Sequence, residues 1–298
     1  MTVKDIGEFK LIERFSNKLK TDSTVVKGSG DDCAVLKLDA RSYQLLTCDM
    51  LVEGIDFTPK IDPYLVGRKS IAVSISDIAA CSGQPRYCVV SMGIPKKTSV
   101  KLLDRLFKGM LDIAKEFKIN IVGGDISQSP KITIDVSMLG RVEKKNLTLR
   151  SSARSGDLIF VTGSLGGSIS GKHLKFIPRI NEARFLAKEF KVNAMIDISD
   201  GLSQDLAHIL KQSKVGAIIY EDLIPMDEKS TSLSDALNSG EDFELLFTMS
   251  RKIAKRLLKR NLVNFKPIGE IVGEKYGFTL INKDGKPIKI SPKGYRHF

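Results

Sequence analysis

The sequence predicts a two-domain protein of the α+β or α/β class, in which β-sheets are covered by helices. The chain has 298 residues, more than one domain usually holds. Strand-like and helix-like segments alternate through both halves, and some strands are neighbours in the sequence. A polar stretch, "EKKNLTLRSSARSGD", separates the halves. We therefore predict an N-terminal domain of residues 1–147 and a C-terminal domain of residues 148–298.

Periodicity predicts the elements of the first half. Small and apolar residues recur through residues 62–83, with Pro63 suited to a first turn and Gly83 to a stop, so this segment is expected to be a helix. Residues 99–118 form an amphipathic pattern with a basic outer face, which also predicts a helix. Strands are expected at 43–47, 86–95, 119–125 and 131–142.

The second half is predicted in the same way. A strand that begins at residue 157 runs into the glycine loop "GSLGG", and a second strand runs into the turn of "AMIDISDGL". Helices are expected at 179–190, 203–213 and 251–260, and further strands at 216–225, 241–250 and around 277–290.

Composition is that of an ordinary globular protein, with 42% hydrophobic and 28% charged residues. No stretch approaches the roughly 20 apolar residues of a membrane span, and the charged N-terminus lacks the apolar core of a signal peptide. We expect a cytoplasmic protein that does not bind membranes.

The cysteines and the net charge exclude some classes of site and leave others open. The four cysteines form no C-x-x-C pair, which argues against structural zinc and against a disulfide framework and favours free thiols. The net charge of +12 fits nucleic acid, an anionic surface or a lysine-rich surface that attracts phosphorylated substrates. No aromatic platform accompanies the basic helix at 251–260, so a solvated face is favoured and nucleic acid is not an expected partner.

Seven carboxylates stand out: two in a glycine turn, one inside the apolar helix and four at or after the ends of apolar strands. They are Asp31, Asp32, Asp49, Asp77, Asp125, Asp197 and Asp200. Such acids readily converge at one edge of a sheet, and Mg²⁺ requires several oxygen ligands. Turn or cap chemistry explains most of them singly. Asp77, inside the apolar helix, and Asp197, on an apolar strand, instead need a partner or an ion because a buried charge is costly.

Other catalytic motifs have little support. "GSLGGSISGKH" has the G-x-x-x-x-G-K spacing of a phosphate loop, but His173 stands where Mg²⁺ would need Ser or Thr, so a glycine hinge is favoured. No G-x-S-x-G elbow is present. His208 is expected to be a packed or surface histidine rather than a ligand.

In order along the chain, several segments resemble the thiamine-monophosphate kinase family. They are "GEFKLIERF", "GSGDDCAVL", "TCDMLVEGIDF", "GRKSIAVSISDIAACSGQPR", "IVGGD", "LTLRSSARSGD", "VTGSLGGS", "IDISDGLSQDLAHIL", "LNSGEDFELLFT" and "KGYRHF". This family belongs to the superfamily of aminoimidazole ribonucleotide synthetase, selenophosphate synthetase and the hydrogenase-maturation dehydratase.

The resemblance implies a homodimer that forms through the mixed sheet of the N-terminal domain, followed by a C-terminal α/β domain. It implies ATP-dependent phosphorylation of thiamine monophosphate to thiamine diphosphate by direct in-line transfer with several Mg²⁺ ions. The matching Mg²⁺ positions are Asp32, Thr47, Cys48, Asp49, Asp77, Asp125, Asp197 and Asp200. The matching ATP positions are Gly124, Asp125, Arg150 and Ser199, and those for the thiamine substrate are Asp56, Glu241 and Tyr295.

Three departures from the family pattern stand out. Cys48 replaces a small hydroxyl residue, and its effect depends on whether this position coordinates through its backbone or its side chain, because Mg²⁺ prefers oxygen. Asp56 stands where many relatives carry His. "GGDISQSP" lacks the Thr and Arg of the commoner "GGDTTRGP".

Two classes of alternative function remain open. One is another ATP-dependent enzyme of the superfamily that acts on a different acceptor. The other is a non-catalytic protein, either a nucleotide-binding module or a basic nucleic-acid-binding protein. The ordered acidic motifs favour catalysis, because phosphoryl transfer needs charge neutralisation and positioning rather than a covalent nucleophile.

Overall fold

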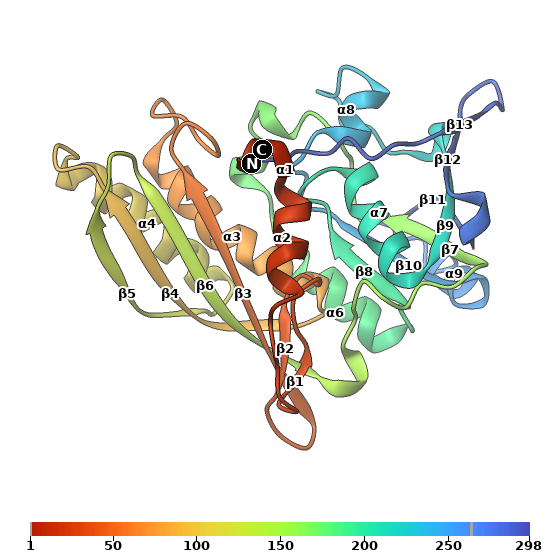
Figure 1. Cartoon of the computed structure of the whole chain (residues 1–298), viewed down its shortest axis with the longest axis horizontal. Coiled ribbons are helices and arrows are strands. Elements are labelled where there is room, and N and C mark those ends of the chain that lie inside the picture. Colours follow the sequence, from red (N-terminus) through yellow and green to blue (C-terminus); the bar gives the residue numbers. More distant parts are fainter. Residues whose placement is uncertain (1, 263–264) are drawn as a thin grey trace.

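Two β-sheets, one from each half of the chain, lie next to each other (Figure 1). The structure is a computed structural model that describes residues 2–262 and 265–298. The strands of the N-terminal sheet are β1 (Val25–Lys27), β2 (Ala34–Lys37), β3 (Ser42–Val52), β4 (Gln84–Ile94), β5 (Asn120–Gln128) and β6 (Thr133–Glu143). Their order is β1-β2-β3-β6-β4-β5, and only the β4–β5 pair of this sheet is parallel.

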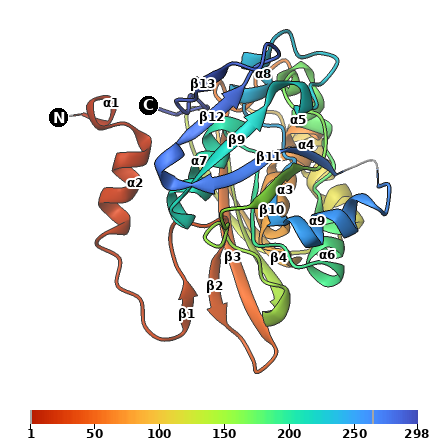
Figure 2. The same cartoon turned by 90° about the vertical axis from the view of Figure 1, so that its right-hand side faces the viewer.

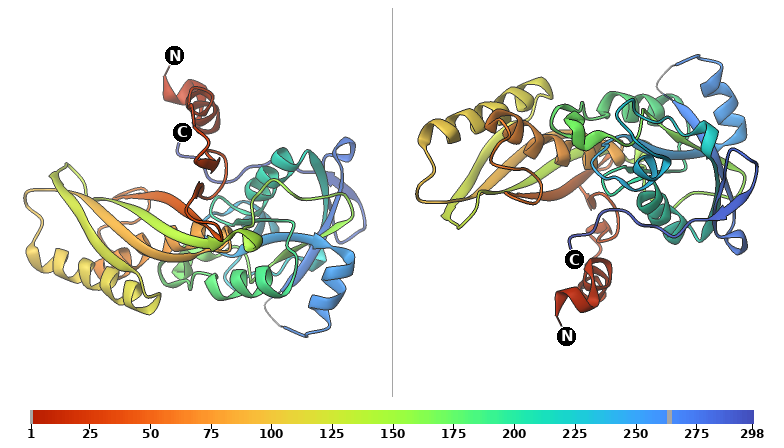
Figure 3. Two further views of the ribbon diagram at one scale, coloured as in Figure 1. Left: turned by 90° about the horizontal axis from the view of Figure 1, so that it is seen from below. Right: turned by 90° about the horizontal axis from the view of Figure 1, so that it is seen from above.

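Two helices, α3 (Pro63–Ala80) and α4 (Val100–Glu116), cover one face of this sheet (Figure 3). The side chain of Asp62 accepts a hydrogen bond from the Tyr64 N–H at 3.0 Å and caps α3, and Pro63 fits its first turn. Ser99 caps α4 in the same way. Both starts follow the rules by which the two helices were predicted.

Helix α3 is buried on nearly all sides because it lies between the N-terminal sheet and the C-terminal half. Its small residues allow close packing. A Cβ added at Gly67 would lie 1.9 Å from the Leu106 carbonyl oxygen, and one at Gly109 of α4 would lie 2.0 Å from the Tyr64 carbonyl oxygen. Only glycine permits this approach of the two helices. The acidic and basic side chains of α3 are consequently held in fixed surroundings.

The opposite face of the N-terminal sheet is left open by the described residues (Figure 3). Leu46, Cys48 and Met50 of β3 are exposed there, and Tyr87 and Val89 of β4 lie on the same face. The pairing register confirms the shared face, since Cys48 and Val89 both pair with Ser137 of β6. We call these five residues the open-face patch.

The C-terminal sheet has the order β13-β12-β9-β11-β7-β10-β8. Its strands are β7 (Asp157–Val161), β8 (Ala194–Asp197), β9 (Val215–Tyr220), β10 (Leu245–Ser250), β11 (Lys266–Gly273), β12 (Phe278–Ile281) and β13 (Pro287–Lys289). The helices of this half are α5 (Lys172–Lys175), α6 (Ile180–Glu189), α7 (Leu202–Ser213), α8 (Leu233–Asn238) and α9 (Arg251–Leu258). The short 3₁₀ turns are η1 (Lys144–Asn146), η2 (Ser168–Ser170), η3 (Glu221–Leu223) and η4 (Glu274–Tyr276).

Two apolar cores hold this half in place. One lies between the sheet and helices α7 and α8, around Ile196 and Leu206. The other lies on the opposite sheet face with α6 and α9, where the Phe160 and Phe247 rings stack 5.2 Å apart. This second core continues into that of the N-terminal half. The continuity positions the ends of β3, α3 and β8 relative to one another.

The N-terminal helices α1 (Val3–Ile6) and α2 (Glu8–Ser16) stand at the side of the molecule, and the two chain ends lie close together (Figures 1 and 2). The His297 N–H donates to Glu8 at 2.9 Å. Within residues 2–262 and 265–298, no helix has the length and apolar character needed to cross a membrane.

The predicted fold class is confirmed, since each half forms a mixed sheet with helices. The pattern analysis missed α1, α2, β1, β2, α5, α8 and β11. Five of these have six residues or fewer, α2 has nine, and β11 begins "KPIG", where Pro and Gly favour a loop. The domain boundary between residues 147 and 148 stays a prediction; it falls in the segment between η1 and β7.

Candidate active site

Three carboxylates from distant parts of the sequence meet where the two halves join. Asp32 precedes β2, Asp77 lies on α3 and Asp197 ends β8. One oxygen of each lies within 4.8 Å of the others. Asp32 and Asp197 are buried and Asp77 is half-buried. We call these three residues the acidic cluster.

Hydroxyl groups hold the acids in place. Thr47 of β3 donates to Asp77, and Ser76 of α3 donates to Asp197 at 2.6 Å. Ser74, also on α3, donates at 2.8 Å to Asp49, which extends the cluster along β3. These bonds fix the carboxylate orientations.

Burial strongly disfavours the charged forms of these acids. It raises the pKa of Asp197 to about 8, and the charge of Asp32 adds to the effect. Burial and then the charges of Asp49 and Asp197 raise the pKa of Asp77 well above its usual range. Like charges at about 4.8 Å repel by about 3 kcal/mol at an effective dielectric constant of about 20. The cluster therefore needs added positive charge to be fully ionised at neutral pH.

Arg150 supplies part of that charge. Its Nη2 and Nε donate to the two oxygens of Asp32, at 2.7 and 3.2 Å. Burial disfavours the charged guanidinium, but Asp32 and Asp31 outweigh it and raise the pKa of Arg150. One guanidinium cannot neutralise three carboxylates.

The donor set fits a hard divalent cation. Mg²⁺ binds carboxylate oxygens and water, and the acidic cluster offers three carboxylates within reach of one another, with Asp49 beside them. The raised pKa values show that the metal-free arrangement is electrostatically unfavourable. The residues present thus suit bound Mg²⁺.

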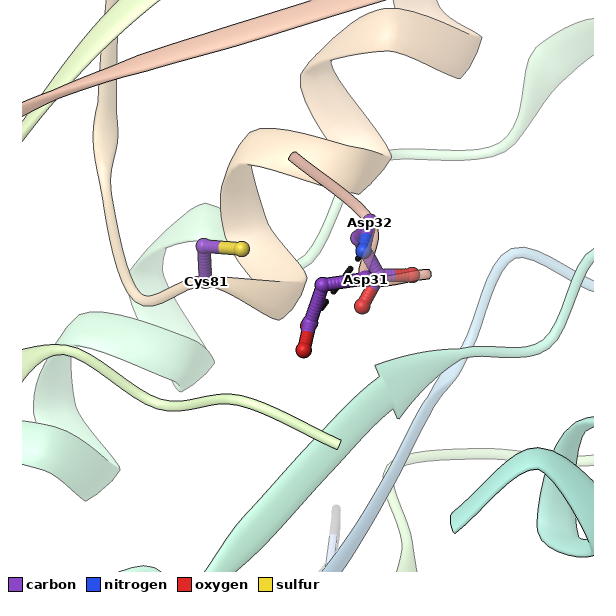
Figure 4. Close-up of side chains that lie close together, drawn as sticks. All are labelled: Asp31, Asp32 and Cys81. Atoms are coloured by element: carbon purple, nitrogen blue, oxygen red, sulfur yellow. Dashed lines mark hydrogen bonds between the residues drawn. The ribbon is translucent and has the colours of Figure 1, made fainter. Parts of the chain in front are cut away.

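Asp31 and Cys81 lie beside the acidic cluster (Figure 4). The Asp31 carboxylate accepts from the backbone N–H of Arg150 at 3.3 Å and lies 3.8 Å from Lys27 Nζ. Burial and then the charge of Asp32 raise the pKa of Asp31 to about 6. The Cys81 side chain points toward both acids from the C-terminal end of α3 (Figure 4). All four cysteines are free thiols, as predicted; Cys48 is exposed and the other three are buried.

Three predicted metal ligands, Cys48, Asp125 and Asp200, lie outside the acidic cluster of one chain. The thiol of Cys48 lies on the open face of the sheet, because Thr47 and Asp49 on either side of it point toward α3. Only its backbone is left to face a metal near Asp77. Asp125 pairs with Ser91 of β4 and is exposed on that same open face.

Asp200 forms a separate group with Asp205 and His208 of α7. Asp205 accepts from the N–H groups of Asp200 and Gly201, at 3.1 and 3.0 Å. Burial raises the pKa of Asp200 to about 6 and lowers that of His208 to about 4. His208 also packs edge-on against Phe9, as expected of a packed histidine.

The residues predicted for the thiamine substrate lie together. Asp56 and Glu241 are among the charges that raise the pKa of Tyr295, after the larger effect of burial. The Tyr295 N–H donates to the Asp200 carbonyl at 2.9 Å. Beneath them, Lys69 of α3 contacts both Glu241 and the Asp56 carbonyl. We call Asp56, Glu241 and Tyr295 the acceptor pocket.

Pattern reasoning missed Lys69. It singled out Asp77 as a charge inside an apolar helix, and Lys69 interrupts the same helix two turns earlier. The serines of α3 were missed because they read as small helix residues.

Gly124 and Ser199, two further predicted ATP positions, also take part in local packing and hydrogen bonding, and their contact with ATP stays a prediction. A Cβ at Gly124 would lie 1.8 Å from the Val90 carbonyl oxygen, so only glycine fits where β5 approaches β4. The Ser199 carbonyl accepts from the Glu241 N–H at 2.7 Å. In the glycine loop, Lys172 contacts Glu244 at 3.1 Å and donates to the Ser164 carbonyl at 2.7 Å, which agrees with a structural hinge.

Comparisons with known proteins identify the family of the chain. Residues 30–142 match the model "AIR synthase related protein, N-terminal domain", and residues 154–281 match "AIR synthase related protein, C-terminal domain". Thiamine-monophosphate kinase of Buchnera aphidicola (subspecies Schizaphis graminum) is 38% identical, and that of Escherichia coli K12 is 32% identical. The match to the Buchnera protein covers 99% of this chain and 99% of that protein, and the match to the Escherichia coli protein covers 98% of each.

A solved structure, "AaThiL complexed with AMPPCP and TMP", superposes with a TM-score of 0.88 at 31% identity. The match covers 100% of this chain and 99% of that one. A hydrogenase-maturation complex, HypE-HypF, shares the fold at 19% identity with a TM-score of 0.78. The full-length relatives above 30% identity establish that the chain belongs to the thiamine-monophosphate kinase family of AIR synthase related proteins.

Proposed function

We propose that this protein is an ATP-dependent kinase that converts thiamine monophosphate to thiamine diphosphate. One observation carries the proposal: the acidic cluster of Asp32, Asp77 and Asp197 lies at the junction of the two halves, close to Arg150. Its relatives at 38% and 32% identity are thiamine-monophosphate kinases along their whole length. The related solved structure is described as a complex with AMPPCP and TMP.

The reaction requires no covalent enzyme intermediate. A terminal phosphate oxygen of thiamine monophosphate forms a bond to the γ-phosphorus of ATP while the bond from that phosphorus to the β–γ bridging oxygen breaks, which releases ADP. Mg²⁺ held by the acidic cluster would neutralise the negative charge on the phosphoryl oxygens. The residues of the chain hold the two anionic substrates in line.

Several residues are assigned to the two substrates within this proposal. Gly124, Asp125, Arg150 and Ser199 would contact ATP, and the acceptor pocket would hold the thiamine end of the acceptor. Several Mg²⁺ ions would be bound by Asp32, Asp49, Asp77 and Asp197, with Thr47 and the Cys48 backbone beside them and Asp200 at a separate position. The acidic surroundings of Tyr295 suit an acceptor whose rings carry positive charge and N–H donors.

We further propose that the protein is a homodimer that forms through the open-face patch. Met50 at 56% exposed and Tyr87 at 49% are large apolar groups on one sheet face, and such a face is costly to leave in water. Asp125 lies on this face as well, so the dimer would bring it next to a second chain. The free thiols fit the reducing cytoplasm, which we propose as the location.

The direct test is product formation by the purified protein. Mg·ATP is supplied with thiamine monophosphate, with free thiamine or without an acceptor, and ADP and thiamine diphosphate are measured. We expect one thiamine diphosphate to form for each ADP released, and only when thiamine monophosphate is the acceptor. ADP release with a different phosphorylated acceptor would identify another reaction on the same ATP site, and ATP binding without ADP release would identify a nucleotide-binding module.

A further inference from the structure

Lys69 is a fully buried cation in the floor of the acceptor pocket. Its side chain is 0% exposed, although it sits on α3 among small and apolar residues. The ammonium donates to the Asp56 carbonyl at 2.9 Å and to the Glu241 carboxylate. Asp56 belongs to the loop after β3, and Glu241 to the loop before β10. One side chain therefore joins the N-terminal and C-terminal walls of the pocket.

The partner carboxylate is held in one conformation. Glu241 has a φ of 65°, a left-handed backbone that non-glycine residues rarely adopt. Its N–H donates to the Ser199 carbonyl at 2.7 Å, and its carbonyl accepts from the Ser168 hydroxyl at 2.5 Å. Such a conformation persists only where the surroundings enforce it, and it is commonest at functional sites.

The exposure of the ion pair is asymmetric. The side chain of Glu241 is 24% exposed, whereas that of Lys69 is fully buried beneath it. The ammonium can thus orient the carboxylate from below while a carboxylate oxygen stays open to a ligand in the pocket. An ion pair that served stability alone has little advantage over an apolar pair of the same volume.

Resting on the proposed function, we infer that Lys69 is a positioning residue that sets acceptor affinity by aiming the Glu241 carboxylate. The oriented carboxylate meets the ring end of the acceptor, which carries N–H donors and positive charge. The second bond of the ammonium holds the Asp56 loop against the same wall. Lys69 contacts no residue of the acidic cluster among its hydrogen bonds in the described part of the chain, so its effect on ATP should be small.

The test compares Lys69→Met with Glu241→Gln and with the double variant. Methionine keeps an unbranched side chain but removes the charge. Arg68→Met is the matched control, because Arg68 is the neighbouring, half-buried cation of α3 and lies near Tyr64 and Glu116 rather than the acceptor pocket. The measured quantities are kcat, the KM for thiamine monophosphate and the KM for ATP, together with the Tm of each variant.

We expect Lys69→Met to raise the acceptor KM about 10-fold or more, in the range of other residues that orient a functional group, and to leave the ATP KM within about 2-fold. In the Glu241→Gln background, Lys69→Met should raise the acceptor KM little further, because both substitutions remove the same interaction.

Two results would overturn the inference. If Lys69→Met lowers thermal stability but has the same acceptor KM as Arg68→Met, Lys69 is structural. If Lys69→Met does not fold, the double variant provides the test, because it leaves no unpaired buried carboxylate. An acceptor KM of the double variant far above that of Glu241→Gln alone would exclude action through Glu241. Absence of diphosphate formation by the unmodified protein would instead reject the proposed function, and the inference with it.

Discussion

Arg150 donates two hydrogen bonds to Asp32: Nη2 lies 2.7 Å from one carboxylate oxygen, and Nε lies 3.2 Å from the other. The two residues come from opposite halves of the chain, 118 positions apart. Such a bidentate, charge-assisted contact is both strong and directional. It places the first carboxylate of the acidic cluster against the segment that leads into the C-terminal half.

Arg150→Met should destabilise the metal-free protein by about 3–5 kcal/mol, because it leaves Asp32 as an unpaired buried charge. Mg²⁺ should recover part of this loss by neutralising the same carboxylate. Thermal unfolding with and without Mg²⁺ measures both effects. Arg150→Lys should recover only part of the stability, because an ammonium cannot make the two parallel bonds; equal stability of the Met variant and the unmodified protein would contradict the role of the contact.

Asp77→Asn and Asp197→Asn should each lower turnover at limiting Mg²⁺ by about 100-fold, since a neutral amide is a poorer ligand for a hard cation. The measurement is kcat as a function of Mg²⁺ concentration. Asp157→Asn is the control, because Asp157 is an equally buried acid that hydrogen-bonds to Asn193 away from the cluster. Near-normal turnover of both cluster variants at limiting Mg²⁺ would remove these residues from the proposed metal site.

Without metal, the protein should become less stable as pH rises from about 6.5 to about 8. The folded-state pKa of Asp197 is raised to about 8, so the folded protein keeps a proton that the unfolded chain has already released above about pH 4. The stability linked to this proton is lost as pH approaches 8. His208, with its pKa lowered by burial to about 4, is neutral in the folded protein, and its opposite slope fades above about pH 6.5 as the histidine of the unfolded chain also loses its proton.

Differential scanning calorimetry across this window should show Tm falling in chelator and much less in saturating Mg²⁺, because bound metal favours the ionised carboxylate. Asp242, whose pKa burial raises to about 7, should leave a small slope that does not depend on metal. Asp197→Asn should reduce the difference between the two conditions, and the part that remains is due to Asp77, whose pKa is also raised by burial. A Tm that rises with pH in chelator would be the wrong sign for this account.

Met50→Asp should convert the proposed dimer to monomer, because it places a charge within the open-face patch, on the most exposed of its large apolar residues. Light scattering after size-exclusion chromatography measures the mass. Leu111→Asp is the matched control: Leu111 is 47% exposed on the outer side of α4, away from the patch. A dimer that survives Met50→Asp, or an unmodified protein that is monomeric, would reject this interface.

Cys48→Ser should leave kcat and the Mg²⁺ dependence within about 2-fold of the unmodified protein, because surface substitutions away from a site usually have small effects. The thiol lies on the open face, and the backbone of residue 48 keeps its place in the β3–β6 ladder. A large change in Mg²⁺ dependence would show that the side chain takes part in metal binding.

Local pattern was sufficient for the main elements and for naming most of the acids. Helix α3 was predictable from Pro63, Gly83 and its small and apolar residues, and Asp77 stood out because a charge in such a helix needs a partner. Asp197 was identified at a strand end, where the structure places it; Asp49 was expected just after a strand but lies inside β3, which continues to Val52. These inferences depend on neighbours within a few positions, where the spacing of side chains on a helix or strand is known in advance.

Three-dimensional packing was needed for everything that joins the two halves. The sequence could not show that Asp125 and the Cys48 thiol lie on the sheet face opposite Asp49, because a one-residue change in register reverses every side chain of a strand. Nor could it pair Lys69 with Glu241, 172 positions away, or Arg150 with Asp32. Such pairs depend on how the sheets pack around α3, and therefore on the shape of the shared core rather than on any short stretch of residues.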